Sequence, residues 1–252
     1  MSYNIRCGFC EKPDDINHWS KRKILVADLI QKSGADIVGL QEAEEFQVID
    51  LVAALPEYAW YGIGREEGQK GEMNAILVRK SRFAIENPRT IHLSQTPNQV
   101  SLGWDAKYRR TLTMAKLRDV KTNQTINFFN SHFDNEGRLA RLNAANMIVE
   151  EARKLVDEPI VLTGDFNDSP GFDGYVALSG HLFDAAKISD KAPIGGDMSF
   201  NGFGRDLTPG KKIDYIFVSK AFKVKSHAIL TRLYGGNYPS DHYPILSEIS
   251  AQ

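Results

Sequence analysis

Short apolar runs that end abruptly at polar residues recur along the chain, and they predict buried strands. The clearest run covers residues 160–163 and stops at Gly164, which is the pattern of a strand covered on both faces. Residues 35–40 form a second such run. The other predicted strands are residues 2–6, 75–79, 111–117, 125–133, 214–218, 223–231 and 244–249. Pro244 predicts that the last of these is an edge strand, because proline cannot donate to a ladder.

Apolar residues at helical spacing predict three helices between these strands. The first runs from Ser20, a capping residue, to about residue 32, and Gly34 ends it. The others cover residues 46–55 and 138–156, while the Gly-rich residues 171–210 are expected to be irregular. Strand, helix and strand at the start of the chain resemble a parallel crossover unit, but other connections make the same local pattern.

Length and charge narrow the class of protein. The 252 residues contain no low-complexity tract, repeat or linker, so we expect one domain over residues 1–252. With 31 basic and 32 acidic residues the formal net charge is −1, unlike a protein that holds long nucleic acid by bulk positive charge. The apolar runs are too short to span a membrane, so we expect a soluble, cytoplasmic protein, and we expect a monomer. A leader removed before the first strand would leave the same sequence.

Cys7 and Cys10 form a lone Cys-x-x-Cys motif. A zinc ribbon needs a second pair of cysteines, and a redox motif normally opens a helix in a thioredoxin-like unit. The chain shows neither pattern. We therefore expect two ordinary loop cysteines.

Acidic and amide side chains follow two of the buried strands. Asp165 and Asn167 are two residues apart, so in extended backbone they point to the same side, where a hard cation and a phosphate oxygen could be bound. The same residue types also build ordinary turns. Glu42 follows the strand over residues 35–40, and two carboxylates at neighbouring strand ends are costly unless a cation lies between them.

Further polar candidates lie within or beside other strands. Asn4 lies in the first strand, where a buried amide bonded to backbone groups is the ordinary alternative. His132 closes the strand over residues 125–133, and Glu72 precedes the strand over residues 75–79. Arg109 and Arg110 are either solvated charges or a guanidinium pair suited to a phosphate.

Six short motifs occur in the order found in the endonuclease/exonuclease/phosphatase superfamily, which includes pancreatic deoxyribonuclease and exonuclease III. They are Tyr3-Asn4-Ile5-Arg6, Gln41-Glu42, Ser131-His132-Phe133, Gly164-Asp165-Phe166-Asn167, Ile213-Asp214-Tyr215 and Ser240-Asp241-His242. Each motif is weak alone, but six in this order, spread over nearly the whole chain, make the resemblance strong. Residues 103–106, followed by Arg109-Arg110, are similar to bacterial members near the deadenylase-like branch.

The resemblance implies an α/β (α+β) fold of the DNase I-like type. This is a four-layered sandwich in which two mostly antiparallel β-sheets lie face to face and helices flank them. The early strand, helix and strand therefore need not imply a parallel, doubly wound sheet.

The resemblance also implies metal-dependent hydrolysis of phosphate esters, with Mg²⁺ as the cofactor and Mn²⁺ as a possible substitute. Glu42 is then expected to be the principal metal ligand, with Asn4 contributing to the metal and phosphate site. Asp241 would bind the metal or support a residue that does. Glu72 would orient His132, and Arg109 with Arg110 would bind substrate.

The remaining motif residues match catalytic positions of that family. Asp165 resembles the acid that aligns or deprotonates the attacking water, and Asn167 the amide that holds water or a phosphate oxygen. His242 resembles the histidine that contacts the scissile phosphate, with Asp214 fixing its tautomer. His132 would be a second imidazole at the phosphate. Spacing leaves open whether Asp165 or His242 takes the proton from water.

The expected partner is a phosphoester substrate, either a small molecule or a nucleic acid, and not a membrane. A phosphodiesterase is favoured over a phosphomonoesterase. The first alternative is a nuclease or deadenylase, although the chain has no long basic stripe. The second is a non-catalytic binding module on the same fold, which should have lost some of the metal and imidazole positions; here every one is filled.

Overall fold

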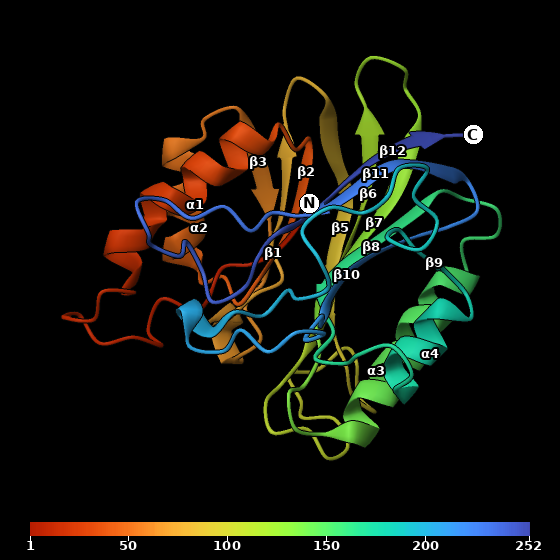
Figure 1. Cartoon of the computed structure of the whole chain (residues 1–252). Coiled ribbons are helices and arrows are strands. Elements are labelled where there is room, and N and C mark those ends of the chain that lie inside the picture. The colour runs from red at the N-terminus through yellow and green to blue at the C-terminus, as the bar shows by residue number, and fades with distance from the viewer.

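Two six-stranded sheets lie face to face, with helices on the outer face of each (Figure 1). The computed structural model describes residues 1–252. In the first sheet the strands are ordered β11 (Phe222–Ile229), β12 (Ile245–Ala251), β1 (Ser2–Asn4), β2 (Ile37–Gln41), β4 (Ile76–Arg79) and β3 (Tyr58–Tyr61). In the second they are ordered β5 (Phe83–His92), β6 (Thr111–Asp119), β7 (Thr125–His132), β8 (Ile160–Asp165), β10 (Asp214–Val218) and β9 (Phe183–Asp184).

Four α-helices form the outer layers (Figure 1). They are α1 (Trp19–Ser33), α2 (Glu45–Ala54), α3 (Arg138–Arg153) and α4 (Asp173–Ser179). Buried apolar side chains of α1 and α2 pack on the first sheet, and those of α3 and α4 pack on the second. A third apolar cluster fills the space between the sheets. The layers are therefore helix, sheet, sheet and helix, as the resemblance implied.

Most neighbouring strands are antiparallel, but each sheet contains one parallel pair. β1 pairs with β2 in parallel, and β7 pairs with β8 in parallel. Helix α1 connects the first pair and α3 connects the second, because parallel neighbours need a crossover connection. The crossover interpretation of the first strand, helix and strand is thus confirmed, within a mostly antiparallel sheet.

A buried polar network joins the two sheets beneath the strand ends. Asn130 of β7 donates to the backbone oxygens of Leu40 and Ala75, at 2.8 and 2.9 Å. Its oxygen accepts from Gln41 Nε2 at 2.7 Å and from Thr163 Oγ1 at 3.0 Å. Gly39 faces this network so closely that a Cβ there would overlap the Thr163 hydroxyl. Since buried amides cost free energy unless they are bonded, the network fixes how the sheets sit on each other.

Several predictions about elements are wrong, each for a local reason. β12 lies between β11 and β1, not at an edge, because Pro244 precedes the strand and so removes no bond from its ladder. Residues 171–210 contain α4 and β9, which are too short to give a periodic pattern. Helix α1 begins at Trp19, and His18 is its N-cap in place of Ser20. Strands β3 and β5 were not predicted, because β3 has only four residues and polar residues interrupt the apolar pattern of β5.

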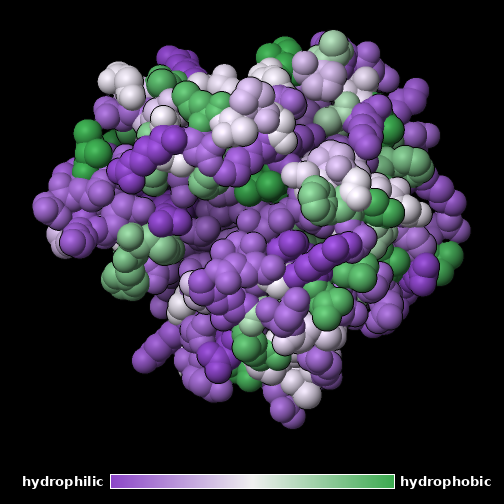
Figure 2. All heavy atoms as spheres, turned by 60° about the horizontal axis from the view of Figure 1, so that its bottom comes forward, coloured by the Kyte–Doolittle hydropathy of each residue, from purple (hydrophilic) through white to green (hydrophobic).

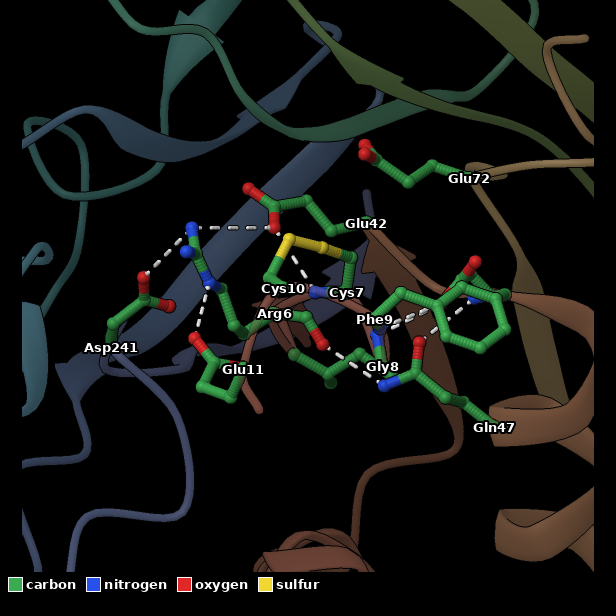
Figure 3. The surroundings of a disulfide bond; sticks show 12 residues. Arg6, Cys7, Gly8, Phe9, Cys10, Glu11, Glu42, Gln47, Glu72 and Asp241 are labelled. Carbon is green, nitrogen blue, oxygen red and sulfur yellow. Dashed lines mark hydrogen bonds and ion pairs between the residues drawn. A yellow bond between two sulfur atoms is a disulfide. The ribbon is translucent and has the colours of Figure 1, made fainter. Parts of the chain in front are cut away.

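The expectation of two ordinary loop cysteines is also wrong. Cys7 and Cys10 form a disulfide in the loop after β1 (Figure 3). The spacing of the cysteines is compatible with such a bond, but the sequence contained no partner motif to suggest it. Disulfides persist in oxidising compartments and are rare in the cytosol. The expected cytoplasmic location therefore gains no support from this bond and stays a prediction. None of the helices is long and apolar enough to cross a membrane.

Candidate active site

The ends of strands from both sheets meet at one place, and each carries a polar side chain. Asp214, at the start of β10, and His132, at the end of β7, both lie in register with Asp165 at the end of β8. In the first sheet, Asn4 ends β1 beside Gln41 of β2, and Glu42 follows directly. On the face turned forward in Figure 2, hydrophilic residues line the hollowed centre of the molecule.

Asn4 connects the acidic groups of the two sheets. Its side-chain nitrogen donates to Glu42 Oε1 at 3.1 Å and to Asp165 Oδ2 at 3.0 Å. Its oxygen accepts from the backbone N–H of Arg6 at 3.0 Å. Asn4 is fully buried, and in this arrangement it holds two carboxylates close together and offers them a donor, which reduces their repulsion.

Asp165 is the centre of the cluster. It is buried, and its Oδ2 lies 3.5 Å from His132 Nε2 and 3.7 Å from His242 Nε2. Its Oδ1 accepts from the backbone N–H of Asn167 at 3.0 Å. Burial, and secondly the charge of Asp214, raise the pKa of Asp165 to about 7. A carboxyl with such a pKa exchanges protons readily near neutral pH.

His242 and Asp214 form a buried pair. His242 Nδ1 lies 2.9 Å from Asp214 Oδ2. Burial alone would lower the pKa of His242, but the charges of Asp214 and Asp165 outweigh it and raise the pKa to about 10. The imidazole is therefore protonated at neutral pH, with Nδ1–H donating to Asp214 and Nε2–H directed at Asp165.

His132 and Asn167 form a second pair on the other side of Asp165. The Asn167 amide donates to the backbone oxygen of Phe133 at 3.0 Å, and its nitrogen lies 3.1 Å from His132 Nε2. Burial, followed by the charges of Arg110 and Arg65, lowers the pKa of His132 well below its usual value. A neutral His132 can accept at Nε2 from the amide, so this side of the site carries no extra positive charge of its own.

Glu42 is held from three sides. Its Oε2 accepts from the backbone N–H of Cys7 at 3.1 Å, and Arg6 Nη1 lies 4.0 Å from the same oxygen. Arg6 Nη1 also lies 3.5 Å from Asp241 Oδ2, so the guanidinium bridges the two acids (Figure 3). Burial would raise the pKa of Glu42, but Arg6, His242 and Asn4 together lower it. For Asp241 burial dominates, and its pKa is raised.

Backbone strain marks three of these positions. Arg6 has φ of 61°, Glu42 has φ of 58° and Asn167 has φ of 47°, in the left-handed region. Asparagine tolerates that region, whereas glutamate adopts it at a cost. Strained residues of this kind concentrate at functional sites, and here the turn at Glu42 directs its side chain toward Asn4.

The donor set fits a hard divalent cation. Ligand atoms of Glu42, His132 and Asp165 all lie within 4.8 Å of one another. Two of the three are carboxylates, and oxygen ligands suit Mg²⁺ and Mn²⁺. The carboxylates approach each other with only the Asn4 amide between them, an arrangement that a cation would stabilise. The Asn4 oxygen accepts from the backbone N–H of Arg6, and its nitrogen donates to both carboxylates, so Asn4 positions the acids, and its expected contribution to metal binding stays a prediction.

A cavity of about 590 Å³ opens above this cluster. It is lined by Glu42, His132, Asp165, Asn167, Asp241 and His242, and beyond them by Arg6, Cys10, Arg65, Glu72, Tyr108, Arg110, Asn135, Phe200, Lys211 and Ile213. A volume of this size suits a small molecule. The lining combines four carboxylates, those of Glu42, Glu72, Asp165 and Asp241, with the cationic side chains of Arg6, Arg65, Arg110 and Lys211, so the cavity is polar and of mixed charge.

The predicted substrate-binding residues are not equivalent. Arg110 lines the cavity; it is buried, with its Nε 3.5 Å from Asp134 Oδ2 and its Nη2 donating to Asn135 at 3.2 Å. Arg109 is paired with Glu66 and does not line this cavity, but it lines a smaller pocket together with Arg110 and Glu72.

Glu72 lines the cavity, but it pairs with Arg65 and not with the expected partner His132. It pairs with Arg65 Nη2 at 2.8 Å and makes no hydrogen bond with His132. Burial, and secondly the charge of Glu42, raise the pKa of Glu72 to about 7. Its expected role in orienting His132 is thus not visible in the contacts.

Sequence reasoning missed five cavity residues that carry charge or aromatic rings. They are Arg6, Arg65, Tyr108, Phe200 and Lys211. Arg6 stands inside the first motif, two residues after Asn4, and Lys211 stands three residues before Asp214, so proximity to a motif could have flagged both. The other three lie in irregular segments, where no pattern shows which way a side chain points.

Comparisons with known proteins agree with this geometry. The model of the Endonuclease/Exonuclease/phosphatase family matches residues 1–242. A family protein from Bacteroides thetaiotaomicron is 34% identical with a TM-score of 0.93, over 98% of this chain and 95% of that chain. A mannosyl-6-phosphatase from Bacteroides thetaiotaomicron is 33% identical with a TM-score of 0.92, over 99% and 98%. The human Nocturnin catalytic domain is 20% identical with a TM-score of 0.77, over 99% and 92%, which shows a shared fold.

Proposed function

The chain belongs to the endonuclease/exonuclease/phosphatase family, and from this premise we propose that it hydrolyses phosphate esters with the help of a divalent metal ion. One observation carries the proposal. Asp165 is in contact with Asn4, His132 and His242, which come from three other parts of the chain. An acid, an amide and two imidazoles gathered around one cavity are the groups that ester hydrolysis at phosphorus requires.

The metal-binding part of the proposal rests on Glu42. Glu42 would hold Mg²⁺ or Mn²⁺ beside Asp165, and the ion, when bound, would neutralise charge on the phosphate oxygens. Asn4 keeps the two carboxylates together through its bonds to both. Arg6, 3.5 Å from Asp241, restrains the second acid beside Glu42. Asp241 then supports the site from the far side of this guanidinium.

The protonation states favour Asp165 as the base. His242 is protonated, because Asp214 and Asp165 raise its pKa to about 10, so it donates to a phosphate oxygen and does not accept a proton. Asp165 is ionised above about pH 7 and can take the proton of the attacking water. Asn167 orients that water or a phosphate oxygen. Positioned acid–base groups of this kind contribute roughly 10²–10⁴-fold to the rate.

A small, polar phosphomonoester is the substrate class that we propose. The sequence favoured a diester, but the mannosyl-6-phosphatase is 33% identical over almost the whole of both chains. The cavity of about 590 Å³ accommodates a sugar-sized alcohol. Arg110 and Lys211 line it and would offset the extra negative charge that a monoester carries compared with a diester.

A nuclease is the second candidate, and the description of the matched family, which includes endonucleases and exonucleases, is the finding that favours it. The net charge of −1 speaks against binding of long polyanions. A non-catalytic module is disfavoured, because burying the polar cluster costs free energy and a module without catalytic activity would not need these buried groups.

A substrate panel tests the proposal. We would measure phosphate release from hexose 6-phosphates and nucleoside monophosphates, chromophore release from an aryl phosphodiester, and cleavage of a labelled oligonucleotide, with Mg²⁺, Mn²⁺ or a chelator. We expect metal-dependent turnover of a sugar phosphate to dominate. Faster cleavage of the diester or oligonucleotide would move the assignment to the corresponding class. Turnover that persists in chelator would refute the metal-dependent mechanism.

A further inference from the structure

The disulfide loop after β1 touches the proposed metal site directly. Cys7 donates its backbone N–H to Glu42 Oε2 at 3.1 Å, and Gly8 donates to Glu44 Oε2 at 2.9 Å. Cys10 lines the cavity. Figure 3 shows the two sulfur atoms beside the Glu42 carboxylate. The disulfide therefore lies next to the carboxylate on which metal binding depends. Hydrolysis of a phosphate ester does not require a disulfide.

The two sulfur atoms and Glu42 have the geometry of a second ligand set. The sulfur atoms of Cys7 and Cys10 and a carboxylate oxygen of Glu42 all lie within 4.8 Å of one another. Once reduced, Cys-x-x-Cys is a spacing that brings two thiolates to one ion, and Zn²⁺ accepts thiolate and carboxylate ligands together. Mg²⁺ is hard and does not favour thiolates, so the same carboxylate would serve a different class of cation.

Reduction of the disulfide would change the charge balance at this place. Arg6 is shared by three carboxylates, with Glu11 at 3.0 Å, Asp241 at 3.5 Å and Glu42 at 4.0 Å. Arg22 Nη2 lies 4.0 Å from Glu11, and the protonated His242 acts on Glu42 and Asp241, so cations already balance these carboxylates. Two thiolates would add negative charge that has no partner. A divalent cation therefore lowers the electrostatic energy of the reduced loop more than that of the oxidised loop.

The two cysteines of the disulfide differ in solvent exposure, and this difference determines which sulfur atom a reductant can attack. Cys10 is exposed, whereas Cys7 is 5% exposed. A thiolate of an external dithiol can attack Cys10 Sγ, which breaks the Cys7–Cys10 bond and releases Cys7 as a thiolate. The second thiol of the dithiol then displaces Cys10 and becomes oxidised to a disulfide itself. Two electrons pass from the dithiol to the protein, and the two cysteines become free.

We propose that Cys7, Cys10 and Glu42 form, when the disulfide is reduced, a binding site for a thiophilic divalent cation such as Zn²⁺. Binding displaces the thiol protons and uses the Glu42 carboxylate, so this site and the magnesium site exclude each other. The inhibitory part of this inference rests on the proposed function, whereas the binding part does not. Reduction thereby makes the enzyme sensitive to zinc, and oxidation makes it insensitive.

Cobalt binding tests the site without any activity measurement. The full chain is reduced with dithiothreitol, freed of reductant without oxygen, and titrated with Co²⁺ while thiolate-to-cobalt charge-transfer absorption is recorded. We expect one Co²⁺ per chain in the reduced protein, displaced by Zn²⁺, and no charge-transfer band in the oxidised protein. No band in the reduced protein, or equal bands in both, would overturn the proposal.

Variants assign the ligands. The double variant Cys7→Ser with Cys10→Ser should lose the band, and Phe9→Ala, a change in the same loop that keeps both sulfur atoms, should retain it. Glu42→Gln should keep the band but weaken binding by at least about 10–100-fold, the range seen even when groups behind a metal ligand are removed. Unchanged affinity in Glu42→Gln would remove Glu42 from the site.

Inhibition is measured separately so that two failures can be told apart. Mg²⁺-dependent hydrolysis by the reduced protein should fall as Zn²⁺ fills the cobalt site, while the oxidised protein keeps its rate at the same Zn²⁺ concentration. A cobalt band together with no hydrolysis under any condition refutes the proposed function and leaves the metal site standing. Hydrolysis without a band refutes the metal site alone, and a band without inhibition refutes the shared use of Glu42.

Discussion

Replacing Asp214 with Asn should destabilise the protein in a way that depends strongly on pH. Asp214 accepts from His242 Nδ1 at 2.9 Å, and both side chains are buried. Asn keeps the shape and an acceptor oxygen but removes the charge. His242 is then left as a buried cation that Asp165, 3.7 Å away, and more weakly Asp241 still compensate, and breaking a buried ion pair by removal of one partner is strongly destabilising.

The magnitude follows from the pKa of His242, which rises from 6.5 to about 10 on folding. One pKa unit corresponds to about 1.4 kcal/mol, so the full shift represents about 5 kcal/mol. Asp165 supplies part of it, so we expect Asp214→Asn to lower the free energy of unfolding by about 3 kcal/mol at pH 6.5. A raised pKa stabilises the folded state below the unfolded value and loses that effect as the pH passes the folded value. The loss should therefore shrink to below about 1 kcal/mol at pH 9.5.

Urea unfolding in chelator, at both pH values, measures this difference. Asp119→Asn is the matched control, because Asp119 accepts from Arg82 Nε at 3.0 Å and lies at the end of β6 opposite to the cavity residue Arg110, which directly precedes the strand. Burial would raise the pKa of Asp119, but bonds from the backbone and from Arg82 together outweigh burial and lower the pKa, so the stabilisation by Asp119 is complete at both pH values. Equal destabilisation of Asp214→Asn at pH 6.5 and 9.5 would refute the charged His242 on which the assignment of Asp165 as base depends.

Three further predictions concern the base, the sheet network and the substrate. Asp165→Asn should lower kcat for phosphate release by about 10²–10⁴-fold, while thermal unfolding stays cooperative; a rate within threefold of the parent would exclude Asp165 as the base. Asn130→Ala should lower the free energy of unfolding by about 2–4 kcal/mol, since it leaves several buried groups unpaired. Asn146→Ala on the exposed side of α3 is the control, and equal stability of the two variants would contradict the network. Raising salt from about 50 to about 200 mM should change kcat/KM for the preferred substrate by less than about tenfold, whereas a protein with many phosphate contacts would lose about 10³–10⁵-fold in affinity.

Apolar patterning predicted two kinds of element. The strands β2 and β8, which are buried on both faces, appear as apolar runs, and the helices α1 and α3, which are buried on one face, appear as apolar stripes. β5 carries Glu86, Asn87 and Arg89 on a partly exposed strand, so its pattern is not distinguishable from that of a loop. The position of β12 inside its sheet depends on pairing with β1, a contact between the two ends of the chain. Local sequence does not encode such a contact.

The candidate site was predictable because its residues stand in motifs at strand ends. Asn4, Glu42, Asp165 and His242 were identified by type and order, and the structure brings them together. The hydrogen bond from the Cys7 backbone N–H to Glu42 and the ion pair between Arg6 and Asp241 were not predictable. They depend on how a loop folds back over the cavity, and the residues in such a loop show no periodicity.

The most direct measurement of the central claim is phosphate release from a sugar phosphate by the parent protein and Glu42→Gln, each with Mg²⁺ and with chelator, beside Glu45→Gln as a control at an exposed position nearby. We predict Mg²⁺-dependent turnover in the parent and in Glu45→Gln, and a loss in Glu42→Gln as complete as the loss caused by chelator. Equal Mg²⁺-dependent rates in the parent and Glu42→Gln would contradict a catalytic metal ion held at the end of β2.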